Sequence, residues 1–469
     1  MARMNTVVFA VHACPVGALG PYGNEWVATP TLDRLAAEGV VFDRHLSDCP
    51  DPTAARRAWL TGTPQTPRRD GQPLPDAGGP GLLARLTAAG VVTVLVDHTR
   101  PGNGPPAEFY AGFRERFAAP PSAADTSPVA ALLRVLPQVA AAVRDGPYLI
   151  RIELDRLVPP WDVPQGVFDA YIEDVFDTTP DDPASRESTL DAEAVLTADQ
   201  DIEVIDPTAG EYFEEVEVED EPAEVRPVAA SIAPWADPPA GWFDRADAAS
   251  WELLHRSFAA AVTQFDADLG RLFAALRDEG LADAAWVVTA DRGQALGEHG
   301  LIGPGRPWLH EELVHVPLMV RLPEGKMAGR RTAELTTPAD VMPTLLELHG
   351  LPADGVPGVS LAPYLGGAPA PSRPAVVSGL VLADASEWAV RTAAWAYLAP
   401  DRVPEDDDPR EAMLFVKPDD RFEMNDVTNE HVEAAAGLEA VLTAAVGEAT
   451  SPPGPLSEAE KGGRTGPLS

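Results

Sequence analysis

The chain has 469 residues, a formal net charge of −38 and an apolar content of 45%. This length favours two domains or one large domain with an appendage, and the apolar content is ordinary for a globular protein. The strong negative charge repels nucleic acid and anionic membranes, so we expect neither as a partner, and only a local basic pocket could bind an anion.

The first third of the chain alternates predicted strands with predicted helices. Residues 5–11 (NTVVFAV) are predicted as a buried strand and not as a signal peptide, because no small-residue cleavage site follows. No apolar run is long enough to span a membrane, and we therefore expect a cytoplasmic protein. Further strands are predicted at 40–42, 91–96 and 148–154, and helices at 31–39, 51–62, 80–90 and 127–143. The alternation predicts an α/β fold, with a mostly parallel sheet covered by helices.

The second part of the chain begins with a change in composition. Residues 168–234 are acidic and have little apolar periodicity, which indicates an insertion that is partly disordered or lid-like; a solvated loop without a role is the alternative. After it we expect helices at 251–280 and 338–350 and strands at 286–288 and 316–322. The main domain is predicted as residues 1–370.

The C-terminal part is expected to form a smaller α+β domain at residues 371–449. Its strands are predicted at 376–382, 388–398 and 412–417, and its last helix at 431–446. The tail at 450–469, rich in Pro, Gly and Ser, is predicted to be disordered.

One carboxylate follows a predicted buried strand in the stretch WVVTADRGQALGEHG at residues 286–300. Ligands of open α/β sheets bind beyond the carboxyl ends of the strands, which makes Asp291 a candidate for metal or substrate contact. The alternative is that Asp291 only caps the following turn.

Several stretches, in order along the chain, resemble the sulfatases of the alkaline phosphatase superfamily. They include the opening run with its YGN turn, CPDPTAARRAWLTG in place of the nucleophile loop, TADRGQALGEHG, HEELVHVPLMVRLPEG and the terminal LFVKPDDRFEMNDV. The resemblance implies the alkaline-phosphatase-like α/β fold, with a mixed, mostly parallel sheet flanked by helices and a smaller C-terminal α+β domain. In that family a divalent cation, usually Ca²⁺, is bound by oxygen ligands and assists sulfate-ester hydrolysis.

The sequence departs from the family pattern where the chemistry lies. The family's two metal-binding Asp fall on His12 and Ala13, and its metal-binding His falls on Arg292. The nucleophile position falls on Pro52, which has no nucleophilic atom, although Thr53 next to it carries a hydroxyl.

Other positions of the resemblance concern the substrate. Two family residues after the third strand fall on His98 and Arg100, and a later Lys falls on Pro304, with Arg306 two residues on. Glu153 stands where the family has an acidic residue or His. Only Asp291 and Arg56 match the family's catalytic set.

Arg292 changes the expected electrostatics of the metal position. Two unit charges about 4 Å apart repel by about 4 kcal/mol at an effective dielectric near 20, and a divalent ion would feel about twice that. We therefore expect Arg292 to occupy the metal's place and to pair with Asp291, which leaves Asp291 and His12 as vestigial metal positions. No cofactor is then expected, and Ca²⁺ or another divalent cation only if the protein is active.

Three functions follow as hypotheses. The first is a sulfatase-like pseudoenzyme that binds a small anion, a sulfate or phosphate ester, or a protein partner, with His98, Arg100, Arg292 and Arg306 as candidate binding residues. The second is an active sulfuric- or phosphoric-ester hydrolase in which Thr53 attacks, His12 acts as base or ligand and Asp291 orients it; Thr53 and Arg56 are the candidate catalytic residues. The third is an interaction subunit that binds a protein through the acidic insertion.

Overall fold

The computed structural model describes residues 3–69, 80–100, 107–120, 129–173, 232–303, 308–403 and 410–447. Arg306, most of the predicted acidic insertion and the tail at 450–469 lie outside these residues. No helix in the described ranges is both long enough and apolar enough to cross a membrane.

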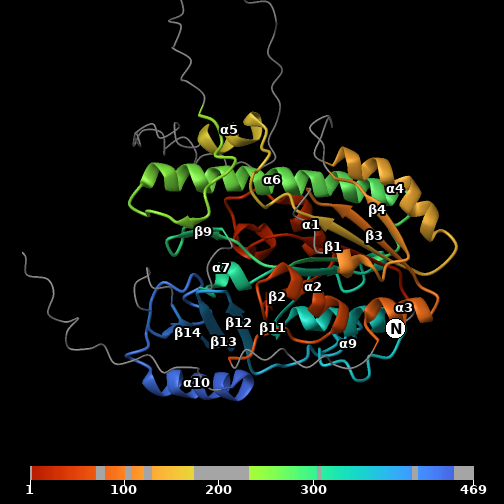
Figure 1. The fold of residues 1–469 in the computed structure, drawn as a ribbon. Helices are drawn as coiled ribbons and strands as arrows, with labels where there is room; N and C mark the ends of the chain where they lie inside the picture. Colours follow the sequence, from red (N-terminus) through yellow and green to blue (C-terminus); the bar gives the residue numbers. More distant parts are fainter. Residues whose placement is uncertain are drawn as a thin grey trace, which may run out of the picture.

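An eight-stranded sheet forms the centre of the molecule (Figure 1). Across the sheet the strands are β11 (Arg330–Thr336), β2 (Val40–His45), β10 (Leu318–Arg321), β7 (Ala285–Ala290), β1 (Thr6–Val11), β5 (Tyr148–Leu154), β3 (Val92–His98) and β4 (Glu115–Ala118). All neighbours pair in parallel except β10, which is antiparallel to both β2 and β7. The predicted mixed, mostly parallel sheet is therefore confirmed.

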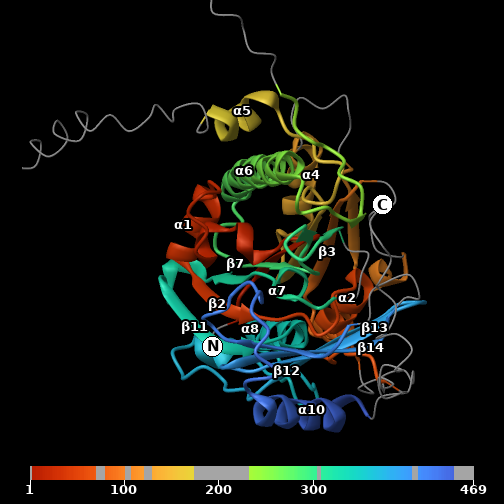
Figure 2. The same ribbon diagram turned by 90° about the vertical axis from the view of Figure 1, so that its left-hand side faces the viewer.

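Helices cover both faces of this sheet, because alternate side chains of the buried strands point to opposite sides. In β1, Val7, Phe9 and Val11 belong to one core, and Val8 and Ala10 belong to the other. The first face carries α1 (Pro30–Glu38), α4 (Ala130–Val143) and α6 (Ala248–Asp278) (Figure 2). The second face carries α2 (Pro52–Thr61), α3 (Leu82–Ala88), α8 (Val341–Leu348) and α9 (Ala362–Leu365).

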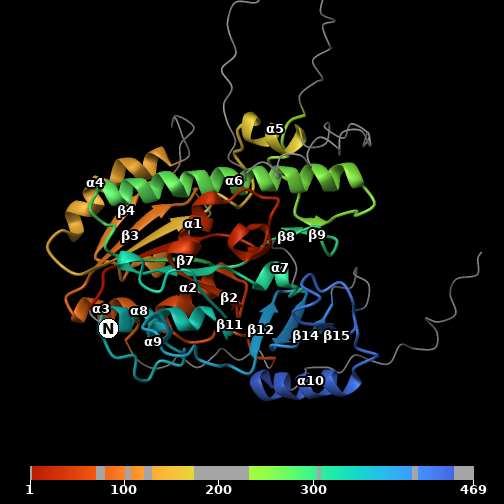
Figure 3. The same cartoon turned by 180° about the vertical axis from the view of Figure 1, so that it is seen from behind.

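A smaller antiparallel sheet follows at the C-terminal end of the chain (Figure 3). It consists of β12 (Val376–Val381), β13 (Ser386–Arg391), β14 (Trp395–Arg402) and β15 (Met413–Val416), and α10 (Val432–Val446) packs on it. The stretch 388–398, predicted as one strand, contains the turn between β13 and β14, where Thr392 N–H donates to Trp395 O over 2.8 Å.

The predicted acidic insertion at residues 168–234 begins within a helix. Residues Gln165–Glu173 form α5, and Phe168 is fully buried in the core that α6 also lines. The remaining short elements are β6 (Gly241–Trp242), β8 (Ala295–Leu296), β9 (Leu301–Gly303) and α7 (Glu311–Val314).

Candidate functional site

Three neighbouring strands bring polar side chains to the same edge of the large sheet. β1 ends at Val11 and β7 at Ala290, and these two residues are paired in register. His12 and Asp291 therefore leave the sheet side by side. Glu153, near the end of β5, pairs with Ala10 of β1 and points to the same region.

Helix α2 supplies Arg56 to this edge. The Asp51 carboxylate caps the helix by accepting the N–H groups of Thr53 and Ala54, each over 2.9 Å. Gly62 ends the helix with a φ of 64°, in the left-handed region that glycine adopts without strain. One turn into the helix, Arg56 Nη1 donates to Pro52 O over 2.8 Å, so the guanidinium lies against the helix N-terminus.

The side chains of Arg56, Asp291, Glu153 and His12 form one buried group, which we call the Arg56 cluster. Arg56 Nη1 donates to Asp291 Oδ2 over 2.8 Å, and Nη2 donates to Glu153 Oε2 over 2.7 Å. His12 Nε2 contacts Arg56 Nη2 and lies 3.1 Å from Glu153 Oε2. Asp291 Oδ1 accepts the N–H of Ala13 over 3.1 Å. The guanidinium thus joins two carboxylates from different strands.

Arg151 adjoins the Arg56 cluster and was not predicted as a site residue. Its Nη2 lies 2.6 Å from Glu153 Oε1, and its guanidinium lies over the Trp59 ring, 4.7 Å from the centroid. The sequence does contain a signal for this pair: Arg151 and Glu153 are opposite charges in the otherwise apolar strand YLIRIEL. They are two residues apart, and alternate residues of a strand point to the same face.

The buried charges of this region favour the ionised carboxylates. Burial opposes ionisation of Glu153, but the charges of Arg151 and Arg56 outweigh it and hold its pKa well below the ordinary value. Asp291 behaves similarly: burial raises its pKa, whereas the charges of His12, Arg56 and Arg292 lower it overall. The negative charges of the two buried carboxylates are therefore balanced by cationic side chains of the same chain.

The residues present do not fit a Ca²⁺-type cation. Such an ion takes six to eight oxygen ligands, and this edge of the sheet offers the carboxylates of Asp291 and Glu153, with the Arg56 guanidinium bonded to both. Nowhere in the described ranges do three or more His, Cys, Asp or Glu side chains form a group able to bind a metal ion.

The predicted pair between Arg292 and Asp291 is wrong. Asp291 Oδ2 is bonded to Arg56 and Oδ1 to the backbone of Ala13, so both of its oxygens are engaged. Arg292 is buried, and the only hydrogen bond that its side chain makes among the described residues is a long one of 3.5 Å from Nη1 to Gly293 O. The charge of Arg292 lowers the pKa of Asp291, although the two side chains form no ion pair.

The remaining candidate residues do not converge on the Arg56 cluster. His98 is buried with Nδ1 2.5 Å from Ala119 O. Arg100 donates to Asp155 Oδ2 over 3.0 Å and to the carbonyl oxygens of Asp155, Val158 and Pro160, so it braces the turn after β5. Thr53 is half-buried in the first turn of α2, and Arg306 lies outside the described residues.

Parts of the chain are similar in sequence to known sulfatases. The sequence model of the family described as Sulfatase matches residues 173–351. The N-acetylglucosamine-6-O-sulfatase of Bacteroides thetaiotaomicron is 34% identical over 121 residues, which are 25% of this chain and 21% of that protein. The matched segment is thus about a fifth of the relative's length.

Two solved structures extend the likeness to most of the chain. The phosphonate monoester hydrolase of Agrobacterium radiobacter aligns with a TM-score of 0.63 at 19% identity, over 94% of this chain and 95% of that chain. A structure in complex with its substrate D-glucosamine-2-N,6-O-disulfate aligns with a TM-score of 0.64 at 18% identity, over 94% and 97% of the two chains. At these identities the likeness concerns the fold.

Proposed function

We propose that the chain is a pseudoenzyme related to the sulfatases of the alkaline phosphatase superfamily, which the family model matching residues 173–351 and the likeness of its fold support. It keeps the family fold but does not hydrolyse sulfate esters by a metal-dependent mechanism. The single observation that carries the proposal is the Arg56 guanidinium, which is hydrogen-bonded to both Asp291 and Glu153. A permanent cation at this place excludes a divalent ion by charge and by volume.

The burial of the Arg56 cluster supports the same proposal. Arg56 is 1% exposed, and Asp291 is fully buried. The cavities of about 320 and 290 Å³ elsewhere in the molecule are lined by other residues. An ester would therefore have to displace internal ion pairs before it met either carboxylate, which is costly for buried charges.

The proposal is tested by assaying the purified protein with 4-nitrophenyl sulfate and 4-nitrophenyl phosphate. The assays are run with added Ca²⁺ and again with EDTA. We expect release of 4-nitrophenol at the rate of a heat-inactivated sample in every condition. Turnover far above that background, abolished by EDTA, would contradict the pseudoenzyme.

An active hydrolase that uses Thr53 is the second candidate. Its support is the position of Thr53 on the same first helical turn against which Arg56 folds. Here turnover would be present, unaffected by EDTA and lost in Thr53→Ala. Turnover unchanged in Thr53→Ala would eliminate this candidate.

A protein partner bound through the acidic stretch is the third candidate. Its support is the composition of residues 174–231, which lie outside the described part of the chain. Deleting these residues and comparing the co-purifying proteins with those of the full chain tests it. An unchanged set of co-purifying proteins would contradict a partner at this stretch.

A further inference from the structure

A cavity of about 320 Å³ lies between the β2–β11 edge of the large sheet and the loop after β15. Its position is separate from the Arg56 cluster, because β10 and β7 lie between β2 and β1 in the sheet. The lining contains two carboxylates, Asp43 and Glu311, the imidazole of His315, and five Arg or Lys side chains, which are Arg44, Arg331, Arg391, Lys417 and Arg421. A chain with a net charge of −38 thus has a locally basic cavity.

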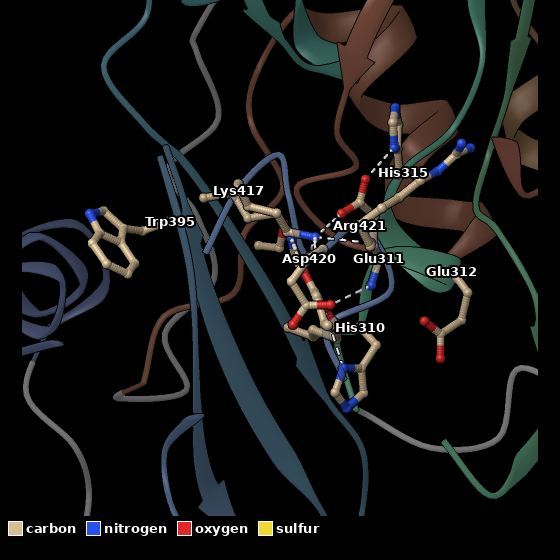
Figure 4. Close-up of polar contacts among 12 residues, drawn as sticks. His310, Glu311, Glu312, His315, Trp395, Lys417, Asp420 and Arg421 are labelled. Atoms are coloured by element: carbon tan, nitrogen blue, oxygen red, sulfur yellow. Dashed lines mark hydrogen bonds and ion pairs between the residues drawn. The ribbon is translucent and has the colours of Figure 1, made fainter. Parts of the chain in front are cut away.

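Three of these five cations are paired with carboxylates. Arg391 Nη2 lies 2.8 Å from Glu423 Oε1, and Lys417 Nζ lies 3.2 Å from the same oxygen and also contacts Glu311 (Figure 4). Arg331 Nε donates to Asp43 Oδ1 over 3.0 Å. The charges of Asp43, Glu311 and Glu423 are therefore balanced by these three cations.

Arg44 and Arg421 keep unmatched positive charge. Arg44, on β2, donates from Nη1 to Ala393 O over 3.2 Å, and Arg421 lies over the Phe422 ring, 5.7 Å from the centroid. Neither forms an ion pair with any residue in the part of the chain that the structure describes, and no dashed line reaches the Arg421 guanidinium in Figure 4. Both side chains are half-buried and line the cavity, and Arg421 also lines the cavity of about 290 Å³.

We propose that this cavity binds a small phosphate monoester, whose dianionic group is bound by Arg44 and Arg421. Guanidinium groups present several N–H donors in a plane, which suits phosphate oxygens. The remaining wall includes Leu46, Leu335 and Pro418, against which an apolar part of the ligand would pack. The volume lies at the lower end of the usual range for small-molecule sites.

The overall negative charge of the protein does not prevent this binding at physiological salt. The Debye length is about 8 Å at 0.15 M ionic strength, so distant surface carboxylates are largely screened and the nearby guanidinium groups dominate. The proposal goes beyond the pseudoenzyme: the site would exist whether or not the Arg56 cluster performs hydrolysis.

The experiment is isothermal titration calorimetry of the full chain with phenyl phosphate and phenyl sulfate at about 0.15 M salt. We expect saturable binding of one phenyl phosphate per chain and at least about tenfold weaker binding of phenyl sulfate, because its group carries one charge fewer. Arg421→Gln and Arg44→Gln should each weaken phenyl phosphate binding about tenfold or more. Arg144→Gln, at an exposed position after α4, is the matched control and should bind as the unchanged protein does.

Two results would overturn the proposal. One is no saturable binding of phenyl phosphate up to about 10 mM; the other is equal affinity in all three variants. Equal affinity for the two esters would overturn the assignment to a dianion. Thermal unfolding of each variant establishes that it is folded. Release of phenol during the titration would contradict the proposed pseudoenzyme and not the proposed site. The phenyl phosphate affinities of Arg44→Gln and Arg421→Gln would still test the cavity.

Discussion

Arg56 Nη1 lies 2.8 Å from Asp291 Oδ2, and both side chains are almost completely shielded from solvent. The two residues are 235 positions apart in the chain, one in the first turns of α2 and the other beyond the end of β7. Arg56 also donates a hydrogen bond to Glu153. Its positive charge therefore balances the two buried carboxylates, which would otherwise need water or a metal ion as partners. The energetics of these ion pairs lead to the first two predictions.

Arg56→Ala should destabilise the protein by about 3–5 kcal/mol, because it leaves two buried carboxylates without their shared cation. Arg57→Ala, the next residue on the same helix, is exposed and should change the free energy of unfolding by less than about 0.5 kcal/mol. Urea denaturation of both variants measures the difference. Similar losses in the two variants would show that the ion pairs contribute little.

The stability of the protein should fall in acid because the pKa values of Asp291 and Glu153 are lowered in the folded state. A lowered folded pKa contributes stability above the unfolded value, near 4, and this contribution is lost as the pH falls through the folded pKa. We expect the urea midpoint to decrease progressively from about pH 5 to pH 2.

A matched pair of variants tests whether Asp291 causes part of this loss of stability in acid. Asp291→Asn should be less stable at pH 7 and should lose less stability on acidification than the unchanged protein does. Asp237→Asn, at an exposed position, should keep the slope of the unchanged protein. A slope unaltered in Asp291→Asn would assign the acid sensitivity to other groups.

Glu298 should make the protein less stable as the pH rises. Burial and the charge of Glu312 raise its pKa to about 7, so the folded state binds more protons than the unfolded state between about pH 4.5 and 7. Stability therefore decreases through this window as the pH increases. Glu298→Gln keeps an oxygen that can accept the N–H of Leu296, which Glu298 Oε2 accepts over 2.8 Å.

Glu298→Gln should accordingly be more stable than the unchanged protein at pH 8, by on the order of 2 kcal/mol, and equal to it at pH 4. Thermal unfolding at the two pH values measures this. A stabilisation of the same size at pH 4 would indicate a packing effect and not a titration.

Glu423 joins the C-terminal sheet to the main sheet. Both of its carboxylate oxygens accept from Arg391, and Oε2 also accepts the N–H of Glu311 at the start of α7 over 3.0 Å. Glu423→Ala leaves the buried Arg391 guanidinium unpaired and should destabilise the protein by about 3 kcal/mol or more.

The variant should also make the chain more susceptible to limited proteolysis around residues 376–446, since the link between the two sheets is weakened. Glu430→Ala, which alters an exposed carboxylate a few residues on, is the control. Identical unfolding midpoints and cleavage rates for the two variants would contradict this role of Glu423.

The sequence by itself determined the local elements and their order. The β-branched run at 5–11, the apolar periodicity at 251–280 and the helix predicted at 51–62 each depend on neighbouring residues, and each agrees with the structure. Family motifs in sequence order also led to the mixed α/β sheet. They located His12, Arg56 and Asp291, which the structure brings together.

Only the tertiary structure decided which charges meet. Sequence adjacency suggested Arg292 as the partner of Asp291, but the partner is Arg56, because α2 packs at the end of β1 and β7 and its guanidinium reaches both carboxylates. The basic cavity lined by Arg44 and Arg421 was likewise not visible in the sequence, because its lining residues come from strands and loops far apart in the chain. Ion pairing depends on distance in space, and the order of residues fixes that distance only through the packed fold.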